Sequence, residues 1–475
     1  MRLFTLLLLL SLTVNPIFGQ SGTKHRVIIL SDIEADPDDT QSMVRLLLYS
    51  NELDIRGLVA TTSCWHKTMV NPESIKRVIQ AYGKVQPNLV KHDPAFPPVD
   101  KLLALVKQGR PEYGMSGVGK GKDSEGSEWI IRELQANDER PLWIPVWGGA
   151  NTLAQALYTL EKKESKKEFK RLLAKLRVYT ISDQDDSGIW LRNNYPELFF
   201  IVSPGDDYGS ATWSAINSFV KGISNETISN NWLAGNIQQG HGPLGAVYPD
   251  VAWGMEGDTP SWLNLIPNGL SDPEHPEWGG WGGRYEYYLP EFTNRKKGGS
   301  GVPFEPETRK IWTDATDVYI PYLHSEYGRN VKKDTASFKD NKVSLWRWRD
   351  DFQHDFAARM DWCTLPYGEA NHPPVIRLSN PEQITVKSGQ GFGLDAIDTI
   401  DPDGDSFSFL WFNYPEAGSR EKPISVEGAE NAHGAYIIAP KVDKEEIAHF
   451  ILKVTDKGVP QLSAYKRIIV TIKPE

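Results

Sequence analysis

An acidic loop early in the chain carries the residues whose types and spacing could do chemistry. Five carboxylates fall within eight positions: Asp32, Glu34, Asp36, Asp38 and Asp39. Carboxylates crowded in this way repel one another, which raises their pKa values unless a cation neutralises them. Calcium is a hard cation that takes several oxygen ligands, so the loop predicts a calcium (Ca2+) site. The alternative is that Asp38 or Asp39 only caps a helix and the other acids are solvated.

The residues around this loop predict a strand before it and a helix after it. Residues 27–30 are an uninterrupted apolar run, and Met43, Leu46 and Leu47 follow at the i, i+3, i+4 spacing of an amphipathic helix. In open α/β sheets, ligands bind in the crevice at the carboxyl ends of the strands. We therefore expect the acidic loop to line a binding site.

A second strand is predicted at residues 54–62, and Trp65 and His66 follow it. If the two strands are parallel neighbours, the end of this strand lies near the acidic loop. Both side chains are therefore candidates to bind a substrate, although a lone histidine is more often structural.

Residues 32–39 resemble the motif Asp-x-Asp-Pro-Gly-x-Asp-Asp with which nucleoside hydrolases open. The spacing of the first, third, seventh and eighth positions is kept, but the third-position aspartate is Glu34 and the Pro-Gly pair is Ala35-Asp36. Over nearly all of the mature chain, the sequence is similar to a secreted bacterial family that is nucleoside-hydrolase-like and linked by name to cellulose binding. The resemblance implies an α/β domain at 24–366, with an open, mostly parallel sheet and flanking helices, followed by an immunoglobulin-like domain.

The resemblance also implies a ligand set for one calcium ion: Asp32, Glu34, Asp39, Asn151 and Asp258. Asn151 stands where a family threonine gives its backbone carbonyl to the metal, or else the segment is a plain strand-to-helix turn with Asn151 or Thr152 as the N-cap. Asp258 precedes a predicted helix in a late loop, as the last metal-ligating aspartate of the family does. Glu34 matches the catalytic aspartate and is the candidate general base. Because glutamate is one methylene longer, Asp36 is the alternative base.

Further residues could bind a sugar. The resemblance assigns Asp38 to a sugar hydroxyl, whereas Trp65 and His66 stand where nucleoside hydrolases carry a sugar-binding asparagine. The predicted strand at 177–181 ends in three aspartates that could accept hydrogen bonds from sugar hydroxyls, unless they form a solvated turn: Asp183, Asp185 and Asp186. The glycine-rich segment 279–285 would present Trp281 to a sugar pocket, or else pack on the core.

The C-terminal part of the chain, 372–475, has a different pattern. After Pro373-Pro374, short alternating strands are separated by turn signals, for example at 407–412, 449–454 and 468–472. This pattern predicts an all-β, immunoglobulin-like sandwich.

Composition and the chain ends restrict the classes of function. Residues 1–20 read as a signal peptide with no cysteine for a lipid anchor, which predicts a secreted or periplasmic protein with no membrane span. The net charge is −10 and no long basic block occurs, which argues against a nucleic-acid polymer as partner. Cys64 and Cys363 either pair or remain two buried thiols. The sequence is compatible with a homo-oligomer as well as with a monomer.

Two functions follow from these observations. The first is an exported, calcium-dependent glycosidase that hydrolyses an N- or O-glycosidic bond of a furanose-like sugar or plant-glycan fragment, with a carboxylate activating a metal-oriented water. The second is a protein that binds cellulose or a related glycan on the same scaffold without catalysis. A calcium-stabilised structural protein is the third alternative. The ligand is in each of the first two cases a carbohydrate or a nucleoside.

Overall fold

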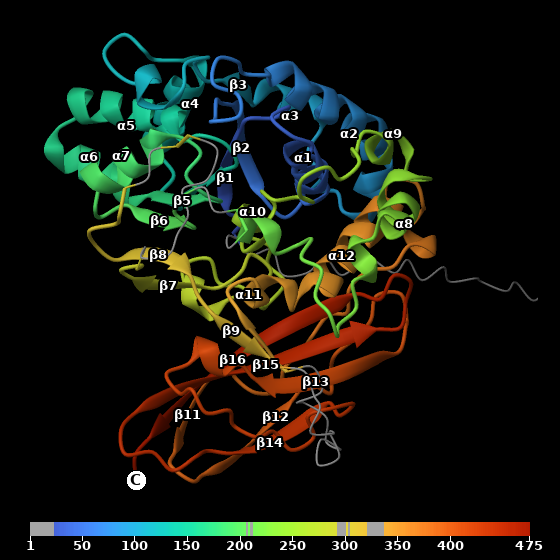
Figure 1. Ribbon diagram of the computed structural model, residues 1–475. Coiled ribbons are helices and arrows are strands. Elements are labelled where there is room, and N and C mark those ends of the chain that lie inside the picture. The colour runs from blue at the N-terminus through green and yellow to red at the C-terminus, as the bar shows by residue number, and fades with distance from the viewer. Residues whose placement is uncertain (1–22, 206–207, 210–211, 292–300, 303–304, 321–336) are drawn as a thin grey trace, which may run out of the picture.

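The computed structural model describes residues 23–205, 208–209, 212–291, 301–302, 305–320 and 337–475. The predicted signal peptide lies outside these residues. Figure 1 shows an α/β part that contains the first helices and strands, and a strand-rich part formed by the C-terminal residues below it. Both Cys64 and Cys363 are buried and free. Within the described residues, no helix combines the length and the apolar character needed to cross a bilayer.

The α/β part is built on an eight-stranded sheet with the order β3-β2-β1-β4-β5-β6-β8-β7. All pairs are parallel except β7 with β8. The strands are β1 (Arg26–Ser31), β2 (Asp54–Ala60), β3 (Val106–Gln108), β4 (Leu142–Val146), β5 (Leu176–Thr180), β6 (Phe199–Val202), β7 (Tyr285–Tyr288) and β8 (Ile311–Asp314). The predicted open, mostly parallel α/β sheet is confirmed.

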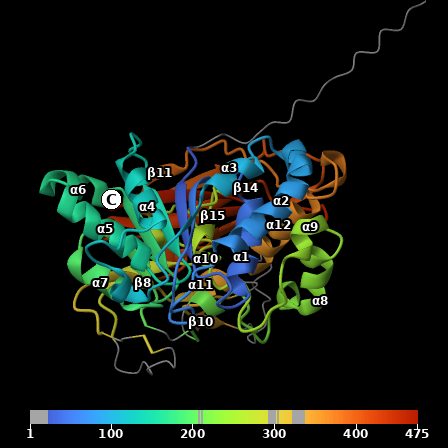
Figure 2. The ribbon, with the colours of Figure 1, turned by 90° about the horizontal axis from the view of Figure 1, so that it is seen from above.

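Helices cover both faces of this sheet. They are α1 (Asp38–Leu48), α2 (Pro72–His92), α3 (Val99–Ala104), α4 (Glu125–Gln135), α5 (Asn151–Lys163), α6 (Lys166–Ala174) and α7 (Asp186–Asn194). Val27 and Ile29 of β1 belong to the core that includes α1 and α2, whereas Ile28 and Leu30 belong to the core that includes α4 and α5. Figure 2 shows α1 and α2 on one side of the strands and α4 to α7 on the other. Burial on both faces explains why β1 is apolar at consecutive positions.

The order in which the chain adds strands to the sheet reverses between β1 and β4. From β1 the chain adds β2 and β3 on one side, and it then returns to pair β4 with the opposite edge of β1. Such a switch point leaves a crevice at the carboxyl ends of the two strands, because the connections leave in opposite directions. The acidic loop follows β1 at this point.

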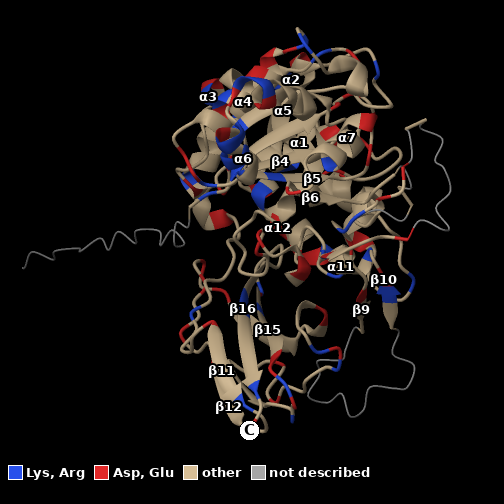
Figure 3. Ribbon diagram, turned by 90° about the vertical axis from the view of Figure 1, so that its left-hand side faces the viewer, with Lys and Arg blue, Asp and Glu red and all other residues tan. Residues whose placement is uncertain are grey.

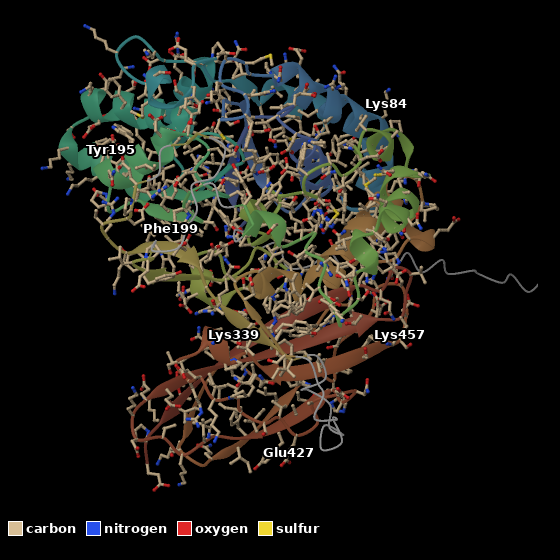
Figure 4. The ribbon with its side chains drawn as sticks, viewed as in Figure 1. Lys84, Tyr195, Phe199, Lys339, Glu427 and Lys457 are labelled. Carbon is tan, nitrogen blue, oxygen red and sulfur yellow. The ribbon has the colours of Figure 1, made fainter. Side chains whose placement is uncertain are left out.

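Short elements and one longer helix complete the α/β part. They are α8 (Asn230–Leu233), α9 (Gly242–Ala246), α10 (Pro260–Leu263), β9 (Asp317–Tyr319), β10 (Phe338–Asp340), α11 (Val343–Trp346) and α12 (Arg349–Asp361). The helix α12 packs on α1, where Tyr49 donates a hydrogen bond to Asp355. Side chains fill the space between the strands and helices of both parts (Figure 4).

The C-terminal part contains two small sheets, β11-β16-β15-β13 and β12-β14. Their strands are β11 (Gln383–Lys387), β12 (Gly391–Asp395), β13 (Phe407–Asn413), β14 (Gly434–Ile438), β15 (Glu446–Asp456) and β16 (Ser463–Lys473). A buried core containing Trp411, Phe450 and Ile468 belongs to this part. The strand-rich architecture agrees with the sequence, and immunoglobulin-like topology remains a prediction. Figure 3 shows this part beneath α11 and α12, with basic and acidic residues interleaved over the outer helices.

Candidate functional site

A cavity of about 420 Å3 lies at the switch point between β1 and β4. Its lining comes from the acidic loop, the start of α1, the segments after β2, β4, β5 and β6, and the segment between α9 and α10. The lining residues are Asp32, Ala35, Asp36, Asp38, Asp39, Trp65, Trp147, Gln184, Tyr208, Trp213, Trp253 and Asp258.

Three aspartates converge on one point of the cavity. Asp38, Asp39 and Asp258 each place one carboxylate oxygen within 4.8 Å of the others. Their side chains are buried, as is that of Asp32, and Oδ2 of both Asp32 and Asp258 has no hydrogen-bond partner among the residues that the structure describes. Among the described residues, no lysine, arginine or histidine lines the cavity. Buried acids without a cationic partner are costly, so this donor set fits a hard cation such as calcium.

Burial and crowding perturb these carboxyl groups. Burial raises the pKa of Asp32 to about 7, with a contribution from the nearby charge of Asp36. Burial also raises the pKa values of Asp38, Asp39 and Asp258 well above the usual range, and neighbouring carboxylates add to each shift. A bound cation would reverse these shifts because it stabilises the ionised forms.

The acidic loop itself positions two of the converging aspartates. Oδ1 of Asp36 accepts a hydrogen bond from the backbone N–H of Asp38 (2.9 Å), the first residue of α1. Ser31, the last residue of β1, donates its hydroxyl to Asp39. Asp36 therefore accepts a hydrogen bond from the first backbone N–H of α1, and the side chains of Asp38 and Asp39 line the cavity. Capping alone does not account for this cluster.

A buried ion pair fixes the loop that carries Asp258. Glu256 has a positive φ of 51° and its carboxylate accepts hydrogen bonds from Arg45 of α1 (3.1 Å) and Tyr248 (2.8 Å). Its backbone N–H donates to Gln41, also on α1. These contacts tie the loop to the helix that carries Asp38, so the third carboxylate of the cluster is placed by tertiary contacts.

Glu34 does not reach the cavity. Its backbone has a positive φ of 80°, and its side chain is 44% exposed and forms an ion pair with Arg77 of α2. The structure therefore does not bring the predicted catalytic base and ligand to the converging aspartates. The alternative base, Asp36, lines the cavity and is half-buried.

The side chain of Asn151 forms hydrogen bonds outside the cavity. Its amide donates to Thr62 Oγ1 (2.9 Å) and to the carbonyl of Glu112 (2.8 Å), and its carbonyl oxygen accepts from Thr61. The residue begins α5 but does not line the cavity. Its side chain joins the end of strand β2 to a neighbouring loop. The N-cap of α5 is Ala150 and no side chain caps it, so Asn151 is not the predicted cap, and a metal contact by its backbone carbonyl stays a prediction.

The three aspartates after β5 have structural partners. Asp183 forms a bidentate ion pair with Arg192 (2.8 and 2.9 Å). Asp185 caps α7 by accepting from the backbone N–H of Ser187, and burial raises its pKa to about 6. Asp186 accepts from the backbone N–H of Met115 (2.7 Å). None of the three lines the cavity.

Of the predicted aromatic and histidine contacts, one lines the cavity and two do not. Trp65 lines the cavity and is 51% exposed, whereas the neighbouring His66 is half-buried outside the lining. Trp281 is 1% exposed and packs against Phe352 and Tyr465 in the core. It therefore corresponds to the core-packing alternative for the glycine-rich segment.

Sequence reasoning missed six lining residues: Ala35, Trp147, Gln184, Tyr208, Trp213 and Trp253. Trp213 donates its indole N–H to Oδ2 of Asp38 (2.7 Å). Its ring lies so close to the next wall of the cavity that a Cβ on Gly257 would be 1.9 Å from the indole nitrogen. Gly257 was the available signal in the sequence, because an indole ring can approach the backbone this closely only at a residue without a side chain.

Comparisons with known proteins agree with this architecture. A family model described as cellulose-binding Sde182, nucleoside hydrolase-like domain, matches residues 26–285, and one described as cellulose-binding protein Sde0182, C-terminal domain, matches residues 391–472. No curated protein matches the sequence.

Two solved structures illustrate the range of similarity. A nucleoside hydrolase-related hypothetical protein from Saccharophagus degradans, described as associated with carbohydrate metabolism, is 33% identical, with a TM-score of 0.77 over 95% of this chain and all of that chain. The effector protein XOO4466 is 11% identical over 61% of this chain and 87% of that chain, with a TM-score of only 0.25. On the family match and the first structure, the chain belongs to the Sde182 family of nucleoside hydrolase-like proteins.

Proposed function

We propose that this protein is an exported, calcium-dependent glycosidase that hydrolyses an N- or O-glycosidic bond of a furanose-like sugar or plant-glycan fragment. The observation that carries the proposal is the convergence of Asp38, Asp39 and Asp258 in a buried cavity without a cationic side chain among its described lining residues. Asp32, whose Oδ2 has no partner in the described part of the chain, completes the donor set. Secretion rests on the signal-like residues 1–20 and suits a carbohydrate substrate outside the cell.

The residues divide into ligands and reacting groups. Asp38, Asp39 and Asp258 would hold the metal, with Asp32 supporting it. Bound calcium would supply an electrostatic site that orients a vicinal diol and a water and lowers the pKa of that water. Asp36, at the cavity wall, takes the proton from the water as general base. The carboxylates around the sugar also stabilise the positive charge that develops as the leaving group departs.

A second function, glycan binding without turnover, is favoured by a specific observation. The glutamate in the motif position of the catalytic base is paired with Arg77 outside the cavity. The family description and the carbohydrate association of the Saccharophagus protein support a glycan ligand for either function. Cellulose or a related glycan is therefore the ligand of the alternative.

The two functions are separated by release of reducing sugar from nucleosides, pentofuranosides and plant-glycan oligosaccharides, with and without a calcium chelator. For the glycosidase we expect turnover that the chelator abolishes and that Asp39→Asn reduces by orders of magnitude. Asp100→Asn, which neutralises an exposed aspartate of α3, is the matched control and keeps full activity. If no substrate in the panel is cleaved while an insoluble glycan retains the protein, binding replaces catalysis as its function.

A further inference from the structure

The exposed tryptophans of this protein are concentrated at one place. The chain has 16 tryptophans, all among the described residues, and only Trp65 and Trp253 are exposed, at 51% and 81%. Both line the cavity. Large flat apolar side chains left in water at a cavity usually mark a surface that a ligand covers. The position of Trp65 and Trp253 therefore indicates a ligand that extends beyond the buried carboxylates.

The cavity has a polar floor and an aromatic mouth. At the floor, the side chains of Asp38, Asp39 and Asp258 are at most 3% exposed, and Trp147 closes the wall beside them. Exposure rises toward Trp65 and Trp253. The cavity volume of about 420 Å3 lies within the range of roughly 300–1,000 Å3 that is typical of sites for drug-sized ligands. Such ligands are larger than a single sugar ring.

The charge of the lining restricts the ligand to neutral molecules. Five aspartates line the cavity, and the described lining contains no basic side chain to meet a phosphate or a uronate. A nucleotide or an acidic sugar would add negative charge beside these five aspartates, with no basic side chain of the described lining to pair with it. Hydroxyl groups, which donate hydrogen bonds to carboxylates, fit the floor without this cost.

The mouth offers ring faces but few polar groups. The indole N–H of Trp65 donates to the hydroxyl of Tyr208 (3.3 Å), and the amide of Gln184 donates to the carbonyl of Trp147. These polar atoms already have partners, so they are poorly placed to read the edge of a nucleobase. The apolar face of a sugar ring can stack on an indole while its hydroxyls stay in water. The hydrogen bond to Tyr208 also fixes the Trp65 ring before a ligand arrives.

We propose that Trp65 and Trp253 form a stacking subsite for a second sugar unit, so that the ligand of this protein is the end of a neutral oligosaccharide and not a nucleoside. The terminal unit lies on the carboxylate floor, and the next unit lies against the two indoles at the mouth. This inference rests on the proposed function, in which the carboxylates at the floor bind a sugar. It adds that the group attached to this sugar is a second sugar unit.

Binding measured against oligosaccharide length tests the subsite. Isothermal titration calorimetry of the full chain in calcium buffer would use glucose, cellobiose, cellotriose and two nucleosides, inosine and cytidine, as probes. We expect the affinity to rise roughly three- to ten-fold from one unit to two and then to level off. Trp253→Ala removes this gain, so that one and two units bind with equal affinity, while Trp253→Tyr keeps most of it.

Phe219→Ala is the matched control, because Phe219 is 80% exposed but does not line the cavity. Equal affinity for one and two units, an equal loss in the control, tighter binding of nucleosides, or no binding of any cello-oligosaccharide would each overturn the subsite. Its failure is distinct from that of the proposed function. A protein that releases single furanosides without a length effect loses only the subsite, and one that binds by length without turnover loses only the glycosidase.

Discussion

At the scale of single residues, the acidic loop separates into side chains that face the cavity and one that does not. Asp38 and Asp39 point to the same site as Asp258, whereas Glu34 pairs with Arg77 at the surface. The loop motif alone does not distinguish these roles, because the positive φ of Glu34 redirects its side chain. Metal affinity measured residue by residue does distinguish them.

Asp258→Asn should therefore weaken calcium binding by at least about 100-fold, since it removes a ligand and not merely a supporting contact. Glu34→Gln should change the affinity by no more than about two-fold, because it removes only an exposed ion pair. Calorimetric titration with calcium chloride, on variants whose far-ultraviolet circular dichroism matches the parent, gives both values. An equal loss in Glu34→Gln would return Glu34 to the ligand set.

The raised pKa values predict how pH acts on the metal-free protein. Burial raises the pKa of Asp32 from the usual 3.8 to about 7, so the folded state binds more protons than the unfolded state between these values. The contribution of this carboxyl to stability in chelator should therefore fall by a few kcal/mol as the pH rises from about 4 to about 7. Saturating calcium should remove the trend, because it stabilises the ionised carboxylates.

Melting temperatures recorded from pH 5 to pH 8, with chelator and with calcium, check this prediction. The difference between the two curves should widen as the pH rises. A constant difference would mean that the buried carboxylates do not take up protons in the absence of metal.

At the scale of elements, local pattern was sufficient where one segment determines its own structure. The apolar run and the helical spacing predicted β1 and α1, and the sheet places their shared loop at the switch point. Residues whose role depends on distant partners could not be derived in this way. Asp183 meets Arg192, Trp281 meets Tyr465, and the cavity wall formed by Trp213 and Trp253 comes from loops without periodicity.

The link between α1 and the Asp258 loop gives a prediction at this scale. Glu256→Gln keeps a hydrogen-bond acceptor for Tyr248 but leaves the buried Arg45 guanidinium without its counter-charge. Breaking such a pair from one side costs about 3–5 kcal/mol, and calcium affinity should fall with it because Asp258 loses its support. Urea denaturation and calcium titration measure the two effects.

Glu274→Gln is the matched control for this loss. It removes the partner of Arg177 in an ion pair whose glutamate is 42% exposed, so it should cost less than about 1 kcal/mol and leave calcium affinity unchanged. A similar small cost for Glu256→Gln would show that the Arg45 pair does not hold the loop.

At the scale of the whole molecule, the C-terminal sheets pack firmly against the α/β part. Arg467 of β16 donates to the carbonyls of Leu270, Trp278 and Gly279, and Tyr414 donates to Asp317. Figure 1 shows β15 and β16 directly beneath α12, whose Asp351 accepts a hydrogen bond from Tyr465. These buried contacts make the C-terminal part a support of the α/β part, so conditions that loosen the junction should also lower overall stability.

Acid is such a condition, because a neutral histidine is built into the junction. Nη1 of Arg467 donates to Nδ1 of His449 (3.1 Å), and burial together with the arginine charge lowers the pKa of His449 to about 3. The unfolded chain takes up a proton near pH 6.5, so the stability that this histidine contributes above 6.5 is lost progressively as the pH falls toward 3. Between pH 6.5 and pH 5 the loss is roughly 2 kcal/mol.

His449→Gln isolates this contribution, since the glutamine side chain offers Arg467 an acceptor that does not titrate. The variant should be less stable than the parent at pH 7, because it loses the edge contact with Trp278, but its stability should decline less between pH 6.5 and pH 5. Urea denaturation at several pH values gives the two slopes. Carboxylates titrate in both proteins and cancel in the difference, so parallel slopes would exclude His449 as the source of acid sensitivity at the junction.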